Sequence, residues 1–235
     1  MKIKRDPIAQ LIRQISSLYP EETAADDRMI INGTGLADKE LLSLDRAFPA
    51  AIERLEKCFS KLTNKYYLDE GETVFNPLHV CQWTMFLYMI SNQLYLDGPE
   101  NIDLCDKIYG LSKMFSSADI YYAVSLPEVF FFDHPQGSVI GRAEYGEYFA
   151  FDQGCTVGNN KGKYPVFGKH VSLKSDSKVI GDCHVGDHVI FAANSYIKDM
   201  DIPSYSIVFG MDRDVLIKPI TEEKYQELSG YLFNG

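Results

Sequence analysis

Long apolar runs are absent from this sequence. The most apolar stretch, residues 77–96, is interrupted by His79, Gln82, Asn92 and Gln93, and only residues 85–90 are apolar without a break. A membrane-spanning helix needs about 20 predominantly apolar residues, so the sequence predicts no membrane span. It also lacks a signal-peptide pattern, and we therefore expect a cytoplasmic protein.

Basic residues and cysteines are also scarce. The chain has 23 Lys and Arg against 33 Asp and Glu, which gives a formal net charge of −10. Nucleic acids and anionic membranes attract basic surfaces, so neither is expected as the main partner. The five cysteines include no C-x-x-C pair. An odd, dispersed set predicts reduced thiols in the core, which suits a cytoplasmic protein.

A six-residue repeat governs the second half of the chain. Large apolar residues recur one hexad apart, and a slim residue follows most of them four positions later. The large positions are Phe167, Leu173, Val179, Val185, Phe191 and Ile197, and the repeat extends upstream through Val139, Tyr145, Phe151 and Val157. This period predicts a left-handed parallel β-helix in which each flat face is one short strand. An ordinary all-β domain is the alternative, but alternating side chains alone do not produce a regular hexad.

The first 115 residues follow a helical period instead. Apolar residues recur at intervals of three and four in four segments, which predicts a helical layer. Asp6-Pro7 provides a cap and a first turn, and Pro49 is expected to kink or restart the second helix. The predicted fold class is therefore α+β, with an N-terminal α-helical domain (1–115), a left-handed parallel β-helix (116–220) and a C-terminal tail (221–235).

The hexad pattern breaks at a corner that carries titratable side chains. The interval from Phe132 to Val139 is seven residues, and Asp133 and His134 lie within it. Because imidazole suits proton abstraction near neutral pH, His134 is the candidate general base. Asp119 lies about one coil earlier, where stacking would let its carboxylate orient the ring. The alternative for a lone histidine is a structural or surface role.

The motifs around this corner resemble those of serine acetyltransferases, members of the hexapeptide acyltransferase family. The family's V-D-I, D-H-A-T-G and L-Q-S-V-T-L-G-G motifs are similar to Ala118-Asp119-Ile120, Asp133-His134-Pro135-Gln136-Gly137 and Asp152-Gln153-Gly154-Cys155-Thr156-Val157-Gly158-Asn159. The resemblance covers residues 118–219, whereas the helical half agrees only in general character. It implies an O-acetyltransferase that uses acetyl-CoA, assembles as a homotrimer or a multiple of three, and has His134 as general base oriented by Asp119.

The resemblance also implies roles for further residues. Asp133 would hold the acceptor through a hydrogen bond. Coenzyme A would lie in the groove between neighbouring β-helices, where small residues let it approach the backbone. The matching cofactor-binding positions are Ser175, Ala192 and Ala193, with Lys198 and Lys218 as phosphate contacts. The alternative for each lysine is a solvated surface charge.

One loop departs from the family pattern. The step from Val157 to Phe167 is ten residues, which predicts an extruded loop over residues 158–166. Where the family has Arg-His-Pro, this loop has Lys163-Tyr164-Pro165. Lysine lacks the bidentate fork that binds a carboxylate, whereas the flat face and hydroxyl of tyrosine suit a sugar ring.

We therefore expect the acceptor to be a sugar hydroxyl of a surface polysaccharide or its precursor, in a pocket shaped by Lys163 and Tyr164. Serine O-acetylation in cysteine biosynthesis is the alternative. His184 and His188 are four residues apart, but that spacing places two side chains together on an α-helix, not in a β-coil. No metal is expected, and a β-helical metal enzyme or a non-catalytic scaffold is the rival from another class.

Overall fold

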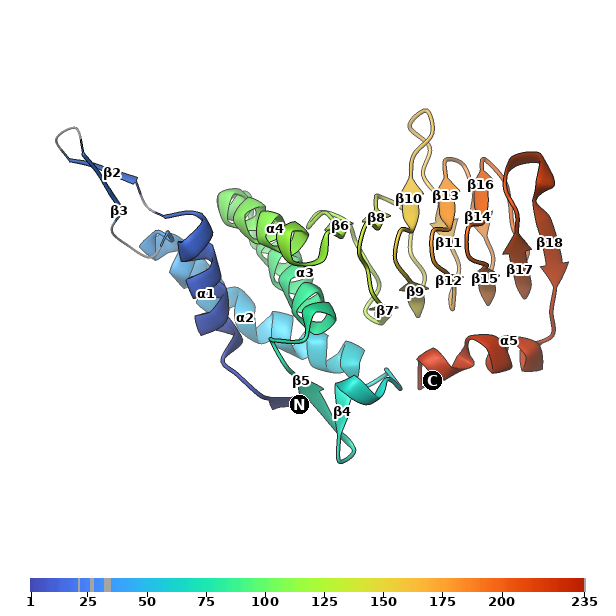
Figure 1. The fold of residues 1–235 in the computed structure, drawn as a ribbon, viewed down its shortest axis with the longest axis horizontal. Helices are drawn as coiled ribbons and strands as arrows, with labels where there is room; N and C mark the ends of the chain where they lie inside the picture. The colour runs from blue at the N-terminus through green and yellow to red at the C-terminus, as the bar shows by residue number, and fades with distance from the viewer. Residues whose placement is uncertain (21, 26–27, 32–34, 235) are drawn as a thin grey trace.

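The protein has two parts that lie end to end. The computed structural model describes residues 1–20, 22–25, 28–31 and 35–234. Helices form one end of an elongated molecule, and parallel strands stacked as a solenoid form the other (Figure 1). This arrangement confirms the predicted fold class. Among the described helices, none has the length and apolar character needed to cross a membrane.

Four helices dominate the N-terminal half: α1 (Pro7–Leu18), α2 (Asp38–Phe59), α3 (Val80–Asp97) and α4 (Ile102–Ser116). Short strands accompany them: β1 (Lys2–Ile3), β4 (Leu68–Asp69) and β5 (Glu72–Phe75) share one sheet, and β2 (Glu22–Ala25) pairs with β3 (Arg28–Ile31). As predicted, Asp6 caps α1, because its carboxylate accepts a hydrogen bond from the Ala9 N–H at 3.0 Å. This bond satisfies one of the free N–H groups of the first turn.

Of the kink or restart predicted at Pro49, the restart does not occur in helix α2. The helix continues through Pro49, which lies on its exposed side. Leu44 before the proline and Leu55 after it are both fully buried. A proline inside a helix costs about 3 kcal/mol. Burial of apolar side chains on both sides of it offsets that cost, since each contributes roughly 1.5–3 kcal/mol.

Helix α3 fixes the start of the solenoid relative to the helices. The Tyr88 hydroxyl donates a hydrogen bond to the Val124 carbonyl, and the Asn92 amide donates one to the Tyr122 carbonyl, both at 2.7 Å. All four groups are buried. Leaving any of them without a partner would cost the desolvation penalty of a buried polar group, so the two halves are held in one relative position.

The solenoid has three faces, each a stack of short strands. The first face contains β6 (Asp119–Ile120), β8 (Val139–Ile140), β10 (Thr156–Gly158), β13 (Lys178–Ile180) and β16 (Tyr196–Lys198). The second contains β7 (Phe130–Phe132), β9 (Phe149–Phe151), β12 (Ser172–Leu173), β15 (Val189–Phe191), β17 (Ser206–Phe209) and β18 (Leu216–Pro219). The third contains β11 (Val166–Phe167) and β14 (His184–Val185). All these pairs are parallel except β17 with the final strand β18.

The hexad residues stack in register inside the solenoid. On the second face Phe151 pairs with Leu173, and Leu173 pairs with Phe191. These three side chains are almost completely buried. The predicted extruded loop is also present, because β10 ends at Gly158 and β11 begins at Val166. Val139 is an exception to the predicted pattern: it is 43% exposed, and Ile140, which pairs with Val157, is buried in its place. From Tyr145 onwards the hexad specifies the core, and its one long step specifies the loop.

The C-terminal segment runs back along the solenoid towards the helices (Figure 1). It contains α5 (Glu222–Leu228), after which the Ser229 hydroxyl lies 2.8 Å from the Ser172 hydroxyl of the second face. Further on, the Thr63 hydroxyl donates a hydrogen bond to the Tyr231 carbonyl. The segment thus connects the last coils to the loop after α2.

A column of stacked rings lies at the corner between the third and second faces. Tyr148 stacks on His170, His170 on His188, and His188 on Tyr205, with centroids 4.3, 4.8 and 4.6 Å apart. Tyr225 of α5 packs edge-on against His188 at 4.9 Å. Burial lowers the pKa of His170 from 6.5 to about 4, and the neighbouring His188 contributes to the lowering.

Acidification from pH 6.5 towards pH 4 should therefore destabilise the protein through His170. Folding keeps this imidazole neutral, whereas the unfolded chain binds a proton below about pH 6.5, so stability falls as the pH falls through this window. His170→Gln should flatten the decline of Tm with pH, as measured by circular dichroism. His184→Gln, at an exposed histidine paired with Asp201, should not. Identical slopes for wild type and His170→Gln would remove His170 as the cause.

Candidate active site

A two-residue insertion creates the corner that carries His134. Between the second and first faces, three coils turn over residues 152–155, 174–177 and 192–195, but this coil uses residues 133–138. Gly137 has a left-handed φ, as do the matching residues of the other corners, Gly154, Asp176 and Asn194. His134 adds a second left-handed φ of 49°. Non-glycine residues rarely adopt this conformation, and it clusters at functional sites.

The insertion leaves the His134 side chain 74% exposed beside a cavity of about 380 Å³. The solenoid contributes Asp133, Asp152, Gln153 and Lys174 to its wall. Thr63 and Asn64 from the loop after α2, and Tyr231 and Leu232 from the C-terminal segment, line the other side. A cavity of this volume suits a small molecule.

Asp133, Asp152 and Lys174 occupy the same position in three successive coils. Each is the first residue after a strand of the second face, and these strands pair in register. The ladder continues into the corner, where the Asp133 N–H donates to the Phe151 carbonyl at 3.2 Å and the Asp152 N–H to the Leu173 carbonyl at 2.9 Å. Since neighbouring strands lie about 4.8 Å apart, the three residues form a column of two carboxylates and one ammonium. We call it the charged column.

Titratable groups from both halves surround His134. The nearest carboxylate is that of Asp133, whose Oδ1 lies 3.7 Å from the His134 Nε2. Burial raises the pKa of Asp152, and Lys174 opposes part of that rise. At the start of α3, burial lowers the pKa of His79. The nearby Asp133 carboxylate opposes this lowering, and His134 adds to it. These environments favour an uncharged His79 and give His134 one close carboxylate.

Asp119 lies outside this cavity. Its carboxylate accepts hydrogen bonds from the Tyr109 hydroxyl and from the Lys113 ammonium, the latter at 2.9 Å. Burial raises the pKa of Asp119, but these two hydrogen bonds outweigh burial and hold the pKa below its ordinary value. In the described part of the chain, no hydrogen bond or ion pair joins Asp119 to His134. Its role in orienting the ring therefore stays a prediction.

Lys163 and Tyr164 lie at the opposite edge of the first face from His134. They belong to the extruded loop between the first and third faces, whereas His134 is at the corner between the second and first. The Lys163 ammonium lies 3.9 Å from the Asp182 carboxylate, and Tyr164 is 40% exposed. Neither residue lines the His134 cavity. One chain alone therefore does not bring this loop to the candidate base.

Three of the five predicted coenzyme-binding residues lie along the same edge as His134. Ser175 follows Lys174, and Ala192 and Ala193 turn the same corner one coil further on. The Asn194 N–H donates to the Ser175 carbonyl at 2.9 Å, so these corners stack directly. Lys198 ends β16 at the other edge of the first face, and Lys218 lies on the terminal strand β18, both exposed.

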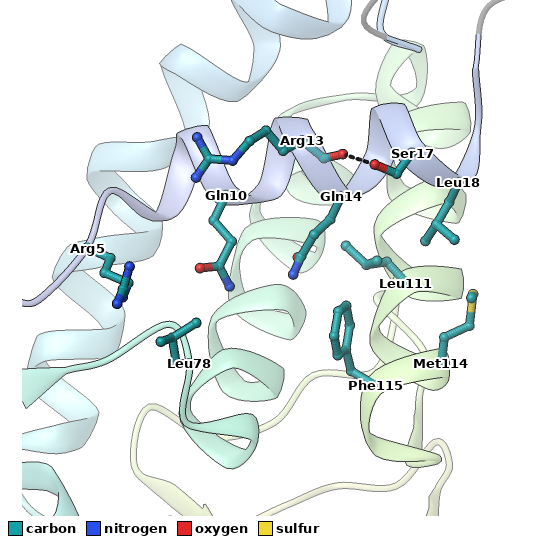
Figure 2. Close-up of a pocket in the computed structure, with 10 residues that line it drawn as sticks. All are labelled: Arg5, Gln10, Arg13, Gln14, Ser17, Leu18, Leu78, Leu111, Met114 and Phe115. Carbon is teal, nitrogen blue, oxygen red and sulfur yellow. Dashed lines mark hydrogen bonds between the residues drawn. The ribbon is translucent and has the colours of Figure 1, made fainter.

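A second cavity, of about 610 Å³, lies in the helical half. Gln10 and Gln14 extend from α1 towards it, and Leu111 and Phe115 of α4 border it (Figure 2). Among the described residues that form its wall there are arginines but no histidine, cysteine or carboxylate. Because a general base is missing from its wall, this cavity does not suit acid-base catalysis.

His184 and His188 do not converge. His184 contacts Asp201, with Nδ1 3.1 Å from the carboxylate, and His188 belongs to the ring column. Over the residues that the structure describes, no three His, Cys, Asp or Glu side chains form a group that could hold a metal ion.

No protein-family model matches the chain. Curated serine acetyltransferases from Staphylococcus aureus (strain N315) and Staphylococcus epidermidis (strain ATCC 12228) are 28% and 29% identical to it over 144 residues. The match covers 59% of this chain and 64% of each relative, so the chain spans just under two thirds of the curated relatives it matches. In sequence and in fold, the chain resembles serine acetyltransferases.

Solved serine acetyltransferases share the architecture of both halves. A complex with CoA has a TM-score of 0.63 at 17% identity and covers 89% of this chain and 83% of its own. The Neisseria gonorrhoeae enzyme has a TM-score of 0.64 at 16% identity, with coverages of 95% and 84%. Isoform 3 from Entamoeba histolytica, in complex with cysteine, has 0.59 at 21%, with coverages of 94% and 74%. The likeness to serine acetyltransferases thus includes the helical half, where the sequence showed only a general similarity.

Several residues of the cavity wall were not singled out from the sequence. Asp152 and Lys174 could have been found, because each is the first residue after a predicted strand of the second face, as Asp133 is, and therefore belongs to the same column. Thr63 and Tyr231 could not, since they are 168 positions apart and are brought together by several hydrogen bonds between the loop after α2 and the C-terminal segment.

Proposed function

We propose that the protein transfers an acetyl group from acetyl-CoA to the hydroxyl of a small acceptor, with L-serine as the preferred acceptor. The observation that supports this most is the exposed His134 on an inserted corner, with a carboxylate at 3.7 Å and a cavity beside it. The similarity in sequence and fold to serine acetyltransferases supports the same reaction class.

His134 would act as general base. Its ring would accept the proton of the acceptor hydroxyl while that oxygen attacks the thioester carbonyl. When the C–S bond then breaks, the protonated ring would return the proton to the sulfur, so that free CoA thiol leaves. Asp133 would orient the ring or the acceptor from its place next to it. Backbone N–H groups at the solenoid corner would stabilise the developing oxyanion. No covalent intermediate with the protein is required, because both substrates can meet at one base.

The acceptor proposal replaces the carbohydrate expected from the loop residues Lys163 and Tyr164. Both residues lie away from the His134 cavity within one chain, and the proteins similar to this chain are named as serine acetyltransferases. A cavity of about 380 Å³ also suits an amino acid better than a polysaccharide chain. These observations favour the serine alternative.

Coenzyme A would extend along the edge that carries Ser175, Ala192 and Ala193, where small side chains allow close approach to the backbone. The lysines Lys198 and Lys218 stay candidate phosphate contacts on a neighbouring surface. We also propose a homotrimer or a multiple of three, since closed symmetry would let a neighbouring β-helix complete the groove for coenzyme A. Five free, buried cysteines fit a reducing compartment such as the cytoplasm.

Acetyl transfer to L-serine should exceed transfer to neutral monosaccharides by tenfold or more in kcat/KM, about the worth of one hydrogen bond to a charged group. Release of free CoA thiol, followed with a chromogenic disulfide, measures both reactions. Tyr164→Ala should leave the KM for serine within about twofold of wild type, since Tyr164 is outside the cavity. A higher kcat/KM for a carbohydrate, lowered by Tyr164→Ala, would restore the sugar acceptor and contradict the serine proposal.

A further inference from the structure

The mechanism above gives no role to two charged side chains of the cavity, Asp152 and Lys174. Lys174 lines the His134 cavity and is partly buried. In the described part of the chain, no hydrogen bond or ion pair engages its ammonium. Asp152, one coil away, is its nearest partner in the charged column and feels its positive charge. An ammonium held at a cavity wall in this way is available to an anionic group of a ligand.

The order of charges in the column matches a zwitterion. Asp133, Asp152 and Lys174 line the cavity in this order along the stack of coils, so two acidic residues come first, starting beside His134, and one basic residue follows one coil beyond Asp152. Successive coils are about 4.8 Å apart, a separation that one amino acid can bridge. An α-ammonium would meet the carboxylates while an α-carboxylate meets Lys174. A neutral sugar would gain no charge-assisted hydrogen bond from this arrangement.

The other candidate cation is less well placed. Lys163 lies at the far edge of the first face, where its ammonium is 3.9 Å from the Asp182 carboxylate. It would have to leave that partner and come from another copy of the chain to reach the cavity. Lys174 is already in the cavity, on the same stack of corners as the base.

We propose that Lys174, and not Lys163, binds the carboxylate of an amino-acid acceptor and so determines that the acceptor is an amino acid. This inference rests on the acetyltransferase function proposed above. It assigns carboxylate binding to a residue of the solenoid wall, whereas the resemblance to serine acetyltransferases would assign it to the extruded loop. Lys174 is a specificity-determining residue in this proposal, and His134 remains the base.

The test compares L-serine with ethanolamine, which has the same hydroxyl and amine but no carboxylate. In the full-length protein, Lys174→Gln should raise the KM for serine by about 10- to 100-fold, the effect of losing a hydrogen bond to a charged group. The KM values for ethanolamine and for acetyl-CoA should stay within about twofold of wild type. Lys174→Arg should restore most of the serine affinity, because it keeps the charge. Thiol release measures every case.

Matched variants separate this role from a general effect of charge. Lys169→Gln removes an exposed lysine from the same coil at another corner, outside the cavity, and should behave as wild type. An equal loss with serine and ethanolamine, a raised KM for acetyl-CoA alone, or a serine defect in Lys163→Gln but not in Lys174→Gln would each overturn the proposal.

Failure of the proposed function would be seen differently. If no hydroxyl acceptor releases thiol with the wild-type protein, the acetyltransferase assignment is wrong, whatever Lys174 does. Calorimetric binding of L-serine then still decides the role of Lys174. Binding that is weakened by Lys174→Gln supports it, and absence of binding to the wild type, or equal binding to both proteins, contradicts it. Circular dichroism of each variant confirms that the fold is retained.

Discussion

His134→Ala should lower kcat for acetyl transfer by about 10²–10⁴-fold, the usual contribution of a positioned general base. The side chain is 74% exposed, so the variant should fold and should keep its affinity for CoA. Single-turnover thiol release measures the chemical step, and calorimetry with CoA measures binding. The left-handed backbone at this position should become less favourable with alanine, but only by a small fraction of the total stability.

A matched control is His184→Ala, since His184 is also exposed and also lies beside a carboxylate, that of Asp201. It stands on the third face, away from the cavity, and its loss should leave kcat unchanged. Turnover near the wild-type value in His134→Ala would remove this residue from the mechanism. A similar loss in both variants would indicate damage to the solenoid instead.

The carboxylate that assists His134 can be identified in the same assay. Asp133→Asn removes the negative charge 3.7 Å from the ring without changing the shape of the side chain, so kcat should fall and its pH profile should shift. Asp119→Asn should act less severely than His134→Ala and also less severely than Asp133→Asn, because Asp119 is occupied by Tyr109 and Lys113 in the same chain. For the two carboxylates, the comparison that decides is between Asp133→Asn and Asp119→Asn. The reverse order would indicate that Asp119 orients the ring in the assembled protein.

The solenoid could be predicted from the sequence because its cause is local. Each hexad places one large side chain inside, so the period from Tyr145 to Ile197 specifies strand, corner and core position without any knowledge of the rest of the chain. The count was wrong only at Val139, because the corner before it is longer than a hexad allows and Ile140 takes the core position. The corner that carries His134 could be predicted for the same reason, since inserted residues interrupt the six-residue spacing. The predicted restart at Pro49 was wrong because the rule for proline is also local. The burial of Leu44 and Leu55, which keeps the helix continuous, depends on the helices that pack against α2.

The site was only partly visible for a related reason. Asp133 and His134 are adjacent in sequence, but the cavity also needs Asn64, Tyr231 and Leu232, which reach it through long-range packing of the loop after α2 and the C-terminal segment. Asp119 was chosen by assuming that residues one coil apart face each other. The structure places Asp152, not Asp119, next to Asp133 in the same column.

Phe151→Ala should lower the free energy of unfolding by about 3–5 kcal/mol, the cost of removing a buried phenylalanine from a core that cannot close around the gap. The Phe151 side chain is 1% exposed, and its ring lies 5.2 Å from that of Phe132. Strands on either side hold the backbone in register, so the cavity left by the ring would persist. Urea unfolding at one fixed protein concentration measures the change, because assembly would make stability depend on concentration.

This substitution also tests the link between the core and the site. The Phe151 carbonyl accepts the hydrogen bond of the Asp133 N–H at 3.2 Å, so a shift of strand β9 would move the corner that carries His134. Phe151→Ala should therefore lower kcat even under conditions where the protein remains folded. Phe209→Ala removes the same ring from a position that is 39% exposed on β17, and should change stability by only about 0.5 kcal/mol and leave kcat unaltered. If Phe151→Ala destabilises the fold but leaves kcat at the wild-type value, the corner is held by its own insertion and not by the stacked strands beneath it.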